Sequence, residues 1–141
     1  MKVFISCVSK KKDCTCEAKD LYNSTYFDYC LKYARTLTDD KNIYILSALY
    51  GVLELTDIIS PYEKTLNKMC KSERIEWANR VKNQLANKNI KHDDEVTILA
   101  GKRYYENILD YFDKVNLPLA EHKGIGLQLQ FMKNYLCEVS K

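Results

Sequence analysis

Groups that can bind anions or take part in acid–base chemistry follow each apolar run of this 141-residue chain. Thiol, hydroxyl and ammonium groups come after the first run, and hydroxyl groups and glycines follow the later ones. Such groups can hydrogen-bond to phosphate and to the polar edges of small molecules. The candidates are Ser6, Cys7, Ser9, Lys10, Lys11 and Lys12 after the first run; Ser47, Tyr50 and Gly51 after the second; Gly101, Lys102 and Tyr104 after the third; and Gly124, Gly126 and Gln128 after the last.

A second group of candidates lies in residues 49–71, which have neither helical nor strand periodicity. Long connections without regular structure are often functional. Asp57 or Glu63 would act as a general acid or base, and the rings of Tyr50 and Tyr62 would stack on a nucleic-acid base. An ordered surface loop with an aromatic anchor is an equally open interpretation. The predicted catalytic residues are Asp57, Glu63 and Ser47, with Pro61 and Lys64 among the ligand-binding residues.

The candidates after the apolar runs also have purely structural interpretations. Ser47 would then bond to backbone groups, because buried polar groups are nearly always paired. Gly51 and Gly101 would serve turns that need positive φ. Cys7 would be a packed side chain rather than a reactive thiol, since no histidine is near it in the sequence to activate it. The lysine run would be a solvated loop.

The apolar runs do not alternate with polar residues, which predicts strands buried on both faces of a parallel sheet. Helical periodicity between and after them predicts an α/β fold, a three-layer sandwich with a small, mostly parallel sheet and helices on both faces. We expect one domain over residues 1–141. The expected strands are 3–8, 43–48, 96–100 and a weaker one at 115–119 that contains Pro118; the expected helices cover 27–37, 72–85 with Ser72 as N-cap, 104–112, and a last one after Gly126.

The carboxyl ends of the strands are where the chemistry is expected. In open parallel sheets, ligands bind beyond these ends, at the point where the strand order reverses. The candidates that follow the strands should therefore meet in one pocket at this rim. A glycine pair before the last helix, Gly124 and Gly126, could also bring helix N–H groups to a phosphate.

The six cysteines predict neither disulfides nor a metal site. Cys14 and Cys16 are separated by one residue and have no second pair at the spacing of zinc ligands. Cys30 and Cys137 fall on apolar helix faces and are expected in the core. We expect no metal and no cofactor, and a redox role for Cys7, Cys14 and Cys16 remains a separate hypothesis.

Composition and charge exclude several classes of protein. Hydrophobic residues make up 46% and charged residues 29% of the chain, which is typical of a globular protein and not of a disordered one. No run approaches the ~18 apolar residues of a membrane span, and lysines close the first run too early for a signal peptide. We expect a cytoplasmic protein without a membrane partner. The net charge of +3 requires no nucleic-acid partner and excludes none.

Two known families resemble this sequence. The residues 46–53 (LSALYGVL), Asp57 and the Pro61–Tyr62 pair are similar to the central motif of the YaaA family of peroxide-stress proteins. That family has an arginine after the Pro–Tyr pair, where this chain has Glu63, and its members are much longer. Nearly the whole chain resembles a smaller bacterial and phage family of unknown function, through Ser6–Cys7 and the lysines, residues 18–22 (AKDLY), 44–48 (YILSA), 61–66 (PYEKTL), 99–101 (LAG), 124–126 (GIG) and Gln128–Leu129.

The resemblance to YaaA implies a link to oxidative stress and proposed nucleic-acid binding. Together with the strand-end residues, it leads us to expect a domain that binds a nucleotide, a nucleoside or a nucleic-acid base, including the case of an enzyme acting on glycosidic bonds. In that interpretation Ser47 and the Gly101 backbone bind the edge of the base, and Lys64 with the lysine run binds phosphate. The alternative is a nucleic-acid-binding stress protein without catalysis.

Overall fold

The computed structural model describes residues 1–8 and 11–139 as a three-layer α/β sandwich, which confirms the predicted fold class. A five-stranded sheet forms the middle layer, with the order β4-β3-β1-β6-β7. Strands β1, β3, β6 and β7 are parallel, and β4 runs antiparallel to β3. The strands are β1 (Lys2–Ser6), β3 (Ile43–Ser47), β4 (Gly51–Glu54), β6 (Val96–Leu99) and β7 (Val115–Asn116).

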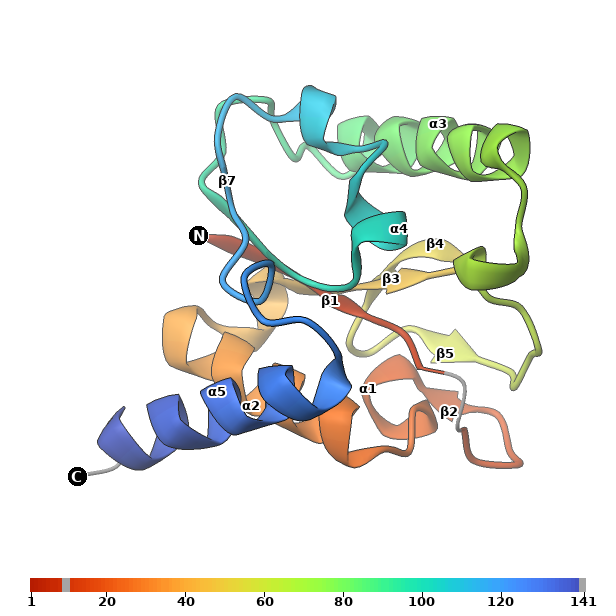
Figure 1. The fold of residues 1–141 in the computed structure, drawn as a ribbon. Helices are drawn as coiled ribbons and strands as arrows, with labels where there is room; N and C mark the ends of the chain where they lie inside the picture. Colours follow the sequence, from red (N-terminus) through yellow and green to blue (C-terminus); the bar gives the residue numbers. More distant parts are fainter. Residues whose placement is uncertain (9–10, 140–141) are drawn as a thin grey trace.

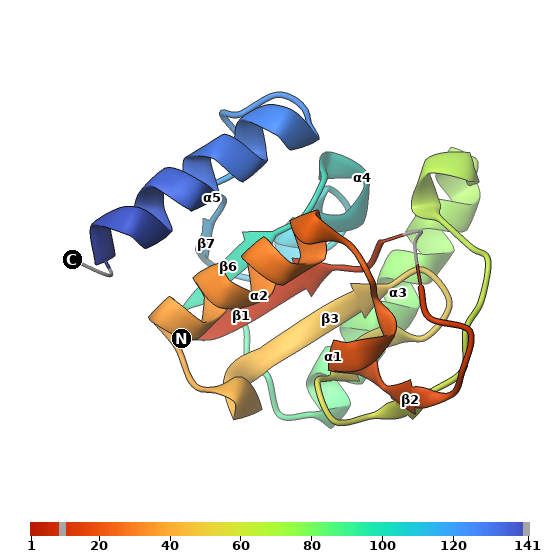
Figure 2. The same cartoon turned by 90° about the horizontal axis from the view of Figure 1, so that it is seen from below.

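Helices cover both faces of the sheet (Figures 1 and 2). α2 (Thr25–Leu37) packs on β1 and against α5 (Ile125–Val139) on one face. α3 (Lys71–Asn87) and the short α4 (Lys102–Tyr105) lie on the other face. The side chain of Ser24 begins α2 by accepting a hydrogen bond from the backbone N–H of Phe27 at 3.0 Å.

The segment 49–71 is more ordered than its sequence pattern indicates. It contains β4, the two-residue strand β5 (Ile58–Ile59) and the 3₁₀ turn η2 (Leu66–Lys68). β5 pairs antiparallel with β2 (Cys16–Glu17), which leads into the short helix α1 (Ala18–Leu21). These elements are too short for periodicity to reveal. Two further 3₁₀ turns are η1 (Asp40–Asn42) and η3 (Leu109–Tyr111).

The core surrounds β1, whose Val3, Phe4 and Ile5 have no exposed surface. This strand pairs with β3 on one side and with β6 on the other, so both of its faces and both of its edges are covered. The predicted central strands are confirmed to within one or two residues. The weaker fourth run forms a strand at the edge of the sheet, as Pro118 predicted. Among the described residues, no helix has the length and apolar character needed to cross a bilayer.

Three expectations about the helices were wrong. α3 begins at Lys71 with Cys70 as N-cap, because the Glu73 carboxylate accepts the backbone N–H of Cys70 at 3.1 Å. The expected helix over 104–112 is broken into α4 and η3, with turn residues between them. Cys30 is buried as predicted, but Cys137 lies on the exposed side of α5.

Gly51 makes the tight turn between β3 and β4. Its φ is +78°, and an added Cβ would overlap the carboxamide oxygen of Gln84. That carboxamide holds the turn, because it accepts the N–H of Val52 at 2.8 Å and donates to the carbonyl of Tyr50 at 3.0 Å. A side chain at position 51 would therefore strain the backbone and displace Gln84 from both partners.

We expect Gly51→Ala to lower the free energy of unfolding by about 2–3 kcal/mol, from backbone strain and lost hydrogen bonds. Urea denaturation measures this change. The control is Gly126→Ala, where a Cβ meets no described atom within 4 Å, and which should be neutral or slightly stabilising. Equal stability of Gly51→Ala and the wild type would contradict the role of this turn.

Candidate functional site

A cleft of about 400 Å³ opens at the carboxyl ends of β1 and β6. Small-molecule sites usually have volumes of about 300–1,000 Å³. Segments far apart in the sequence form its wall. The lining residues are Ser6, Cys7 and Val8 after β1; Tyr26 of α2; Lys64, Thr65 and Asn67 before and within η2; Gly101, Lys102, Arg103 and Tyr104 after β6; and Gly124, Ile125 and Gln128 at the start of α5.

The sheet topology explains why the cleft forms here. The chain leaves β1 toward the face covered by α2 and leaves β6 toward the opposite face, where α4 lies. The segments that follow these two adjacent strands therefore diverge. The crevice between them is the usual ligand position in a parallel sheet. The ends of β1 and β6 share this cleft, but the candidates that follow β3, which are Ser47, Tyr50 and Gly51, do not line it, so the expected single pocket for all strand ends does not form.

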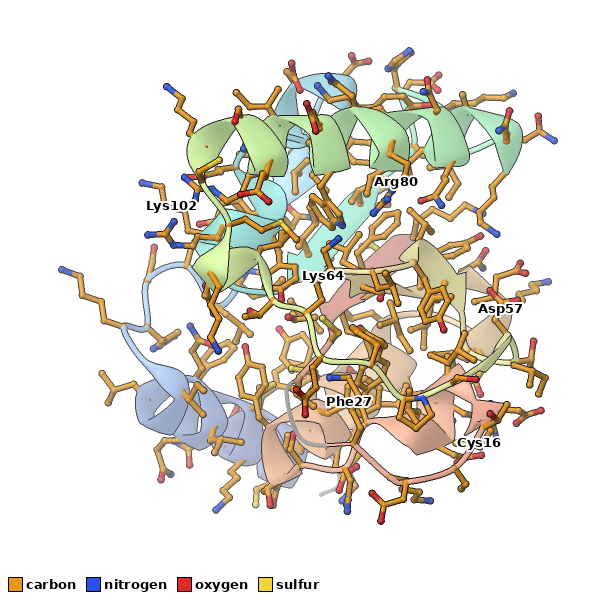
Figure 3. All side chains as sticks on the ribbon, turned by 90° about the vertical axis from the view of Figure 1, so that its right-hand side faces the viewer. Cys16, Phe27, Asp57, Lys64, Arg80 and Lys102 are labelled. Atoms are coloured by element: carbon orange, nitrogen blue, oxygen red, sulfur yellow. The ribbon has the colours of Figure 1, made fainter. Side chains whose placement is uncertain are left out.

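The cleft wall is cationic. Lys64, Lys102 and Arg103 line it, and no carboxylate does so among its described lining residues. Figure 3 looks onto this rim and shows Lys64 near the centre with Lys102 to one side. None of the three forms an ion pair with another described residue. A neighbouring hollow against α3 has Lys64 and Arg80 on its wall, but Glu73 and Glu76 balance them.

Cys7 lies on the cleft wall beside Tyr104. Its thiol sulfur is 3.5 Å from the Tyr104 hydroxyl, and this hydroxyl is also 3.5 Å from the hydroxyl of Thr65. Burial raises the pKa of the Tyr104 phenol above its ordinary value of 10, so the phenol stays protonated at neutral pH. The edge of Tyr104 packs against Trp77 of α3. The contact thus fixes the Tyr104 hydroxyl next to the thiol.

A buried chain of hydroxyl groups lies next to the cleft. The Tyr62 hydroxyl is 2.7 Å from both Ser47 Oγ and the Tyr22 hydroxyl. Ser47 Oγ also accepts the backbone N–H groups of Leu49 and Tyr50, so its own proton points to Tyr62. Ser47 has no exposed surface. These bonds give Ser47 a structural environment outside the cleft wall.

Lys11 covers this hydroxyl chain. Its ammonium nitrogen lies 4.3 Å from the ring centre of Tyr62 and 5.8 Å from that of Tyr22, both within cation–π range. Partial burial lowers the pKa of Lys11, and the nearby Cys7 and Glu63 oppose this effect. Lys11 therefore occupies one face of the Tyr62 ring, on which the sequence interpretation placed a nucleic-acid base.

The structure divides the predicted site residues into three groups. The first lines the cleft, the second surrounds the buried hydroxyl chain or packs beside it, and the third lies outside both. The first group is Ser6, Cys7, Lys64, Gly101, Tyr104, Gly124 and Gln128; the second is Lys11, Ser47, Tyr50 and Tyr62; the third is Gly51, Asp57, Pro61, Glu63 and Gly126. Ser9 and Lys10 lie outside the described residues.

The two predicted carboxylates do not line the cleft. Asp57 follows β4, which runs back toward the amino end of β3, and its carboxylate accepts the backbone N–H of Glu54 at 2.8 Å. In Figure 3, Asp57 and Lys102 lie on opposite sides of the view. Glu63 is exposed and lies outside the cleft wall. The described residues contain no group of three or more metal-ligating side chains.

Sequence reasoning missed Tyr26, Asn67 and Arg103 on the cleft wall. Arg103 follows Lys102 directly, so a search for cations at strand ends could have found it. Tyr26 comes from the first turn of α2, and only the packing of α2 against α5 turns it toward the cleft. Asn67 belongs to a 3₁₀ turn that has no sequence periodicity.

The chain matches a family of unknown function, DUF6884, over residues 3–134. It belongs to the DUF6884 family. The match includes every described segment that lines the cleft. The predicted membership of a small family of unknown function is therefore confirmed.

Two relatives of this DUF6884 protein extend the comparison. The uncharacterised protein YfjM of Bacillus subtilis strain 168 is 31% identical over 117 residues, which are 80% of this chain and 75% of YfjM. A UPF0246 protein of Lactobacillus helveticus strain DPC 4571 is 30% identical over 119 residues, 83% of this chain and 41% of that protein. This chain thus matches about two fifths of the longer relative. UPF0246 proteins form the YaaA family, so the distant similarity to YaaA is also confirmed.

The phenols of Tyr22 and Tyr62 should make the free energy of unfolding depend on pH. Burial raises the pKa of Tyr22 and of Tyr62 above the unfolded value of 10. Above pH 10 the unfolded chain loses phenolic protons that the folded protein keeps, so stability is full below pH 10 and falls above it. We expect Tyr62→Phe to reduce this fall and to cost about 1–2 kcal/mol at pH 7, measured by urea denaturation from pH 7 to 11.

Tyr50→Phe is the matched control at pH 7. It removes only a long hydrogen bond of 3.4 Å to the carbonyl of Ser60 and should cost less than about 0.5 kcal/mol. A Tyr62→Phe variant with the stability and alkaline profile of the wild type would show that the hydroxyl chain contributes nothing.

Proposed function

We propose that the cleft binds a nucleotide, with the phosphate held by Lys64, Lys102 and Arg103. The observation that supports this is the cationic wall, without a lining carboxylate, at the crevice between β1 and β6. None of the three exposed cations forms an ion pair among the described residues, but Glu73 lies near Lys64, so Lys102 and Arg103 supply most of the attraction for an anionic ligand. The start of α5 adds the positive end of a 15-residue helix at Gly124 and Ile125.

The remaining wall suits the nucleoside part of such a ligand. It offers hydroxyl groups from Tyr26 and Thr65 and carboxamides from Asn67 and Gln128. A small number of placed polar groups is enough to fix the orientation of a ligand in a binding site. Stacking on Tyr50 or Tyr62 does not form part of the proposal, because neither lines the cleft and Lys11 covers one face of Tyr62.

We assign no glycosidic reaction to the cleft. Such a reaction generally uses a pair of carboxylates beside the scissile bond. Asp57 is turned toward the backbone of Glu54, and Glu63 is outside the wall. Ser47, the third predicted catalytic residue, is buried within its own hydrogen bonds. Binding is the function that the geometry supports best.

The double substitution Lys102→Ala with Arg103→Ala should weaken binding of adenosine 5′-monophosphate (AMP) about tenfold, or ~1.4 kcal/mol. Isothermal titration calorimetry measures the dissociation constant. Because the cations are exposed, wild-type affinity should also fall as the salt concentration rises. Lys41→Ala is the control, since this exposed lysine lies in η1 before β3, at the opposite end of the sheet.

Adenosine without phosphate should bind much more weakly than AMP. Equal binding of adenosine and AMP, or a double variant with unchanged affinity, would contradict the proposed phosphate site. A single-stranded oligonucleotide of about ten residues in the same titration tests the nucleic-acid alternative. If it binds far more tightly than AMP and with a steep salt dependence, the phosphate belongs to a strand.

A further inference from the structure

The carboxamide of Gln128 is fixed from two sides on the cleft wall. Its Nε2 donates to the carbonyl of His122 at 3.0 Å, and its Oε1 accepts the hydroxyl of Tyr26 at 2.6 Å. A backbone carbonyl can only accept, so the nitrogen must face His122 and the oxygen must face Tyr26. The orientation of this carboxamide is thereby set by the chain before any ligand arrives.

Tyr26 is a reliable donor in this arrangement. Burial raises the pKa of its phenol, so the hydroxyl keeps its proton at neutral pH. The bond links α2 to α5, whose packing defines this side of the cleft. Gln128 therefore has both a fixed direction and a rigid support. Such support for a binding group lowers the entropy that ligand binding would cost.

Half of the hydrogen-bonding capacity of Gln128 remains for a ligand. A carboxamide has two N–H donors and two oxygen lone pairs, and the two protein contacts use one of each. One donor and one acceptor are left on the same planar group, and Gln128 is one of the residues that line the cleft. This combination complements an edge that offers one acceptor beside one donor.

We propose that Gln128 reads the base of the nucleotide and selects adenine. Adenine presents the N7 acceptor beside the N6 amino donor, and a glutamine carboxamide pairs with both at once. Guanine presents two acceptors there, N7 and O6, so one of them would face the carboxamide oxygen. Hypoxanthine likewise has an oxygen at position 6. The inference rests on the proposed nucleotide site and adds the identity of its base.

The test compares AMP with inosine 5′-monophosphate (IMP), which differ at position 6 of the purine. The wild type should bind AMP at least about tenfold more tightly than IMP, as expected for a bidentate pair. Gln128→Met keeps the length of the side chain and removes both polar groups, so this preference should vanish. Tyr26→Phe leaves Gln128 and its bond to the His122 carbonyl in place but removes the hydrogen bond to its oxygen, and should reduce the preference in part.

Ribose 5-phosphate is the control ligand because it has no base. Its affinity should be the same in the wild type and in Gln128→Met, which would show that the phosphate site is intact. Equal binding of AMP and IMP by the wild type, or a preference that survives Gln128→Met, would overturn the role of Gln128. If AMP, IMP and ribose 5-phosphate all fail to bind, the proposed nucleotide site itself is wrong. The comparison of AMP with IMP on the wild-type protein tests the proposal even if a variant does not fold.

Discussion

Parallel pairing of β1 with strands on both of its sides is the constraint on which the rest of the structure depends. Val3, Phe4 and Ile5 have no exposed surface, and every backbone group of this strand must find its partner in β3 or β6. Parallel strands require crossovers, and right-handed crossovers place α2 and α3 on opposite faces. The crevice at Cys7 and Gly101 follows from these connections.

Rigid packing next to the cleft supports its wall. The Ser47 carbonyl accepts the indole N–H of Trp77 at 2.9 Å, which ties the end of β3 to α3. The side-chain hydroxyl of the same residue, Ser47, belongs to the chain of hydroxyl groups with Tyr62 and Tyr22. These buried polar groups satisfy one another, so they cost little and fix the loops that carry Lys11 and Lys64. The residues most prominent in the YaaA-like motif thus act mainly on the shape of the site.

The hydroxyl chain and the cations of the cleft have different roles. This difference explains how the protein combines stability with an open site. The hydroxyl chain is largely buried, while the cations of the cleft are exposed and form no ion pair among the described residues. Exposed, unpaired cations contribute little to folding and remain free to attract an anion. Cys7 lies between the two clusters, close to Tyr104 on the cleft side.

The sequence by itself determined the four parallel strands and the three long helices α2, α3 and α5, and it predicted the rim of the sheet at which we propose that a ligand binds. Buried parallel strands need continuous apolar residues, and amphipathic helices need a repeat of about 3.6, so both leave a local pattern. The sequence also placed Cys7, Gly101 and Gln128 at strand or helix ends. Only the tertiary structure decided which candidates meet. Asp57 lies away from the cleft because β4 runs antiparallel to β3, and Tyr26 lines the cleft because α2 packs on α5. Such contacts between distant segments depend on three-dimensional packing, which has no periodicity along the chain.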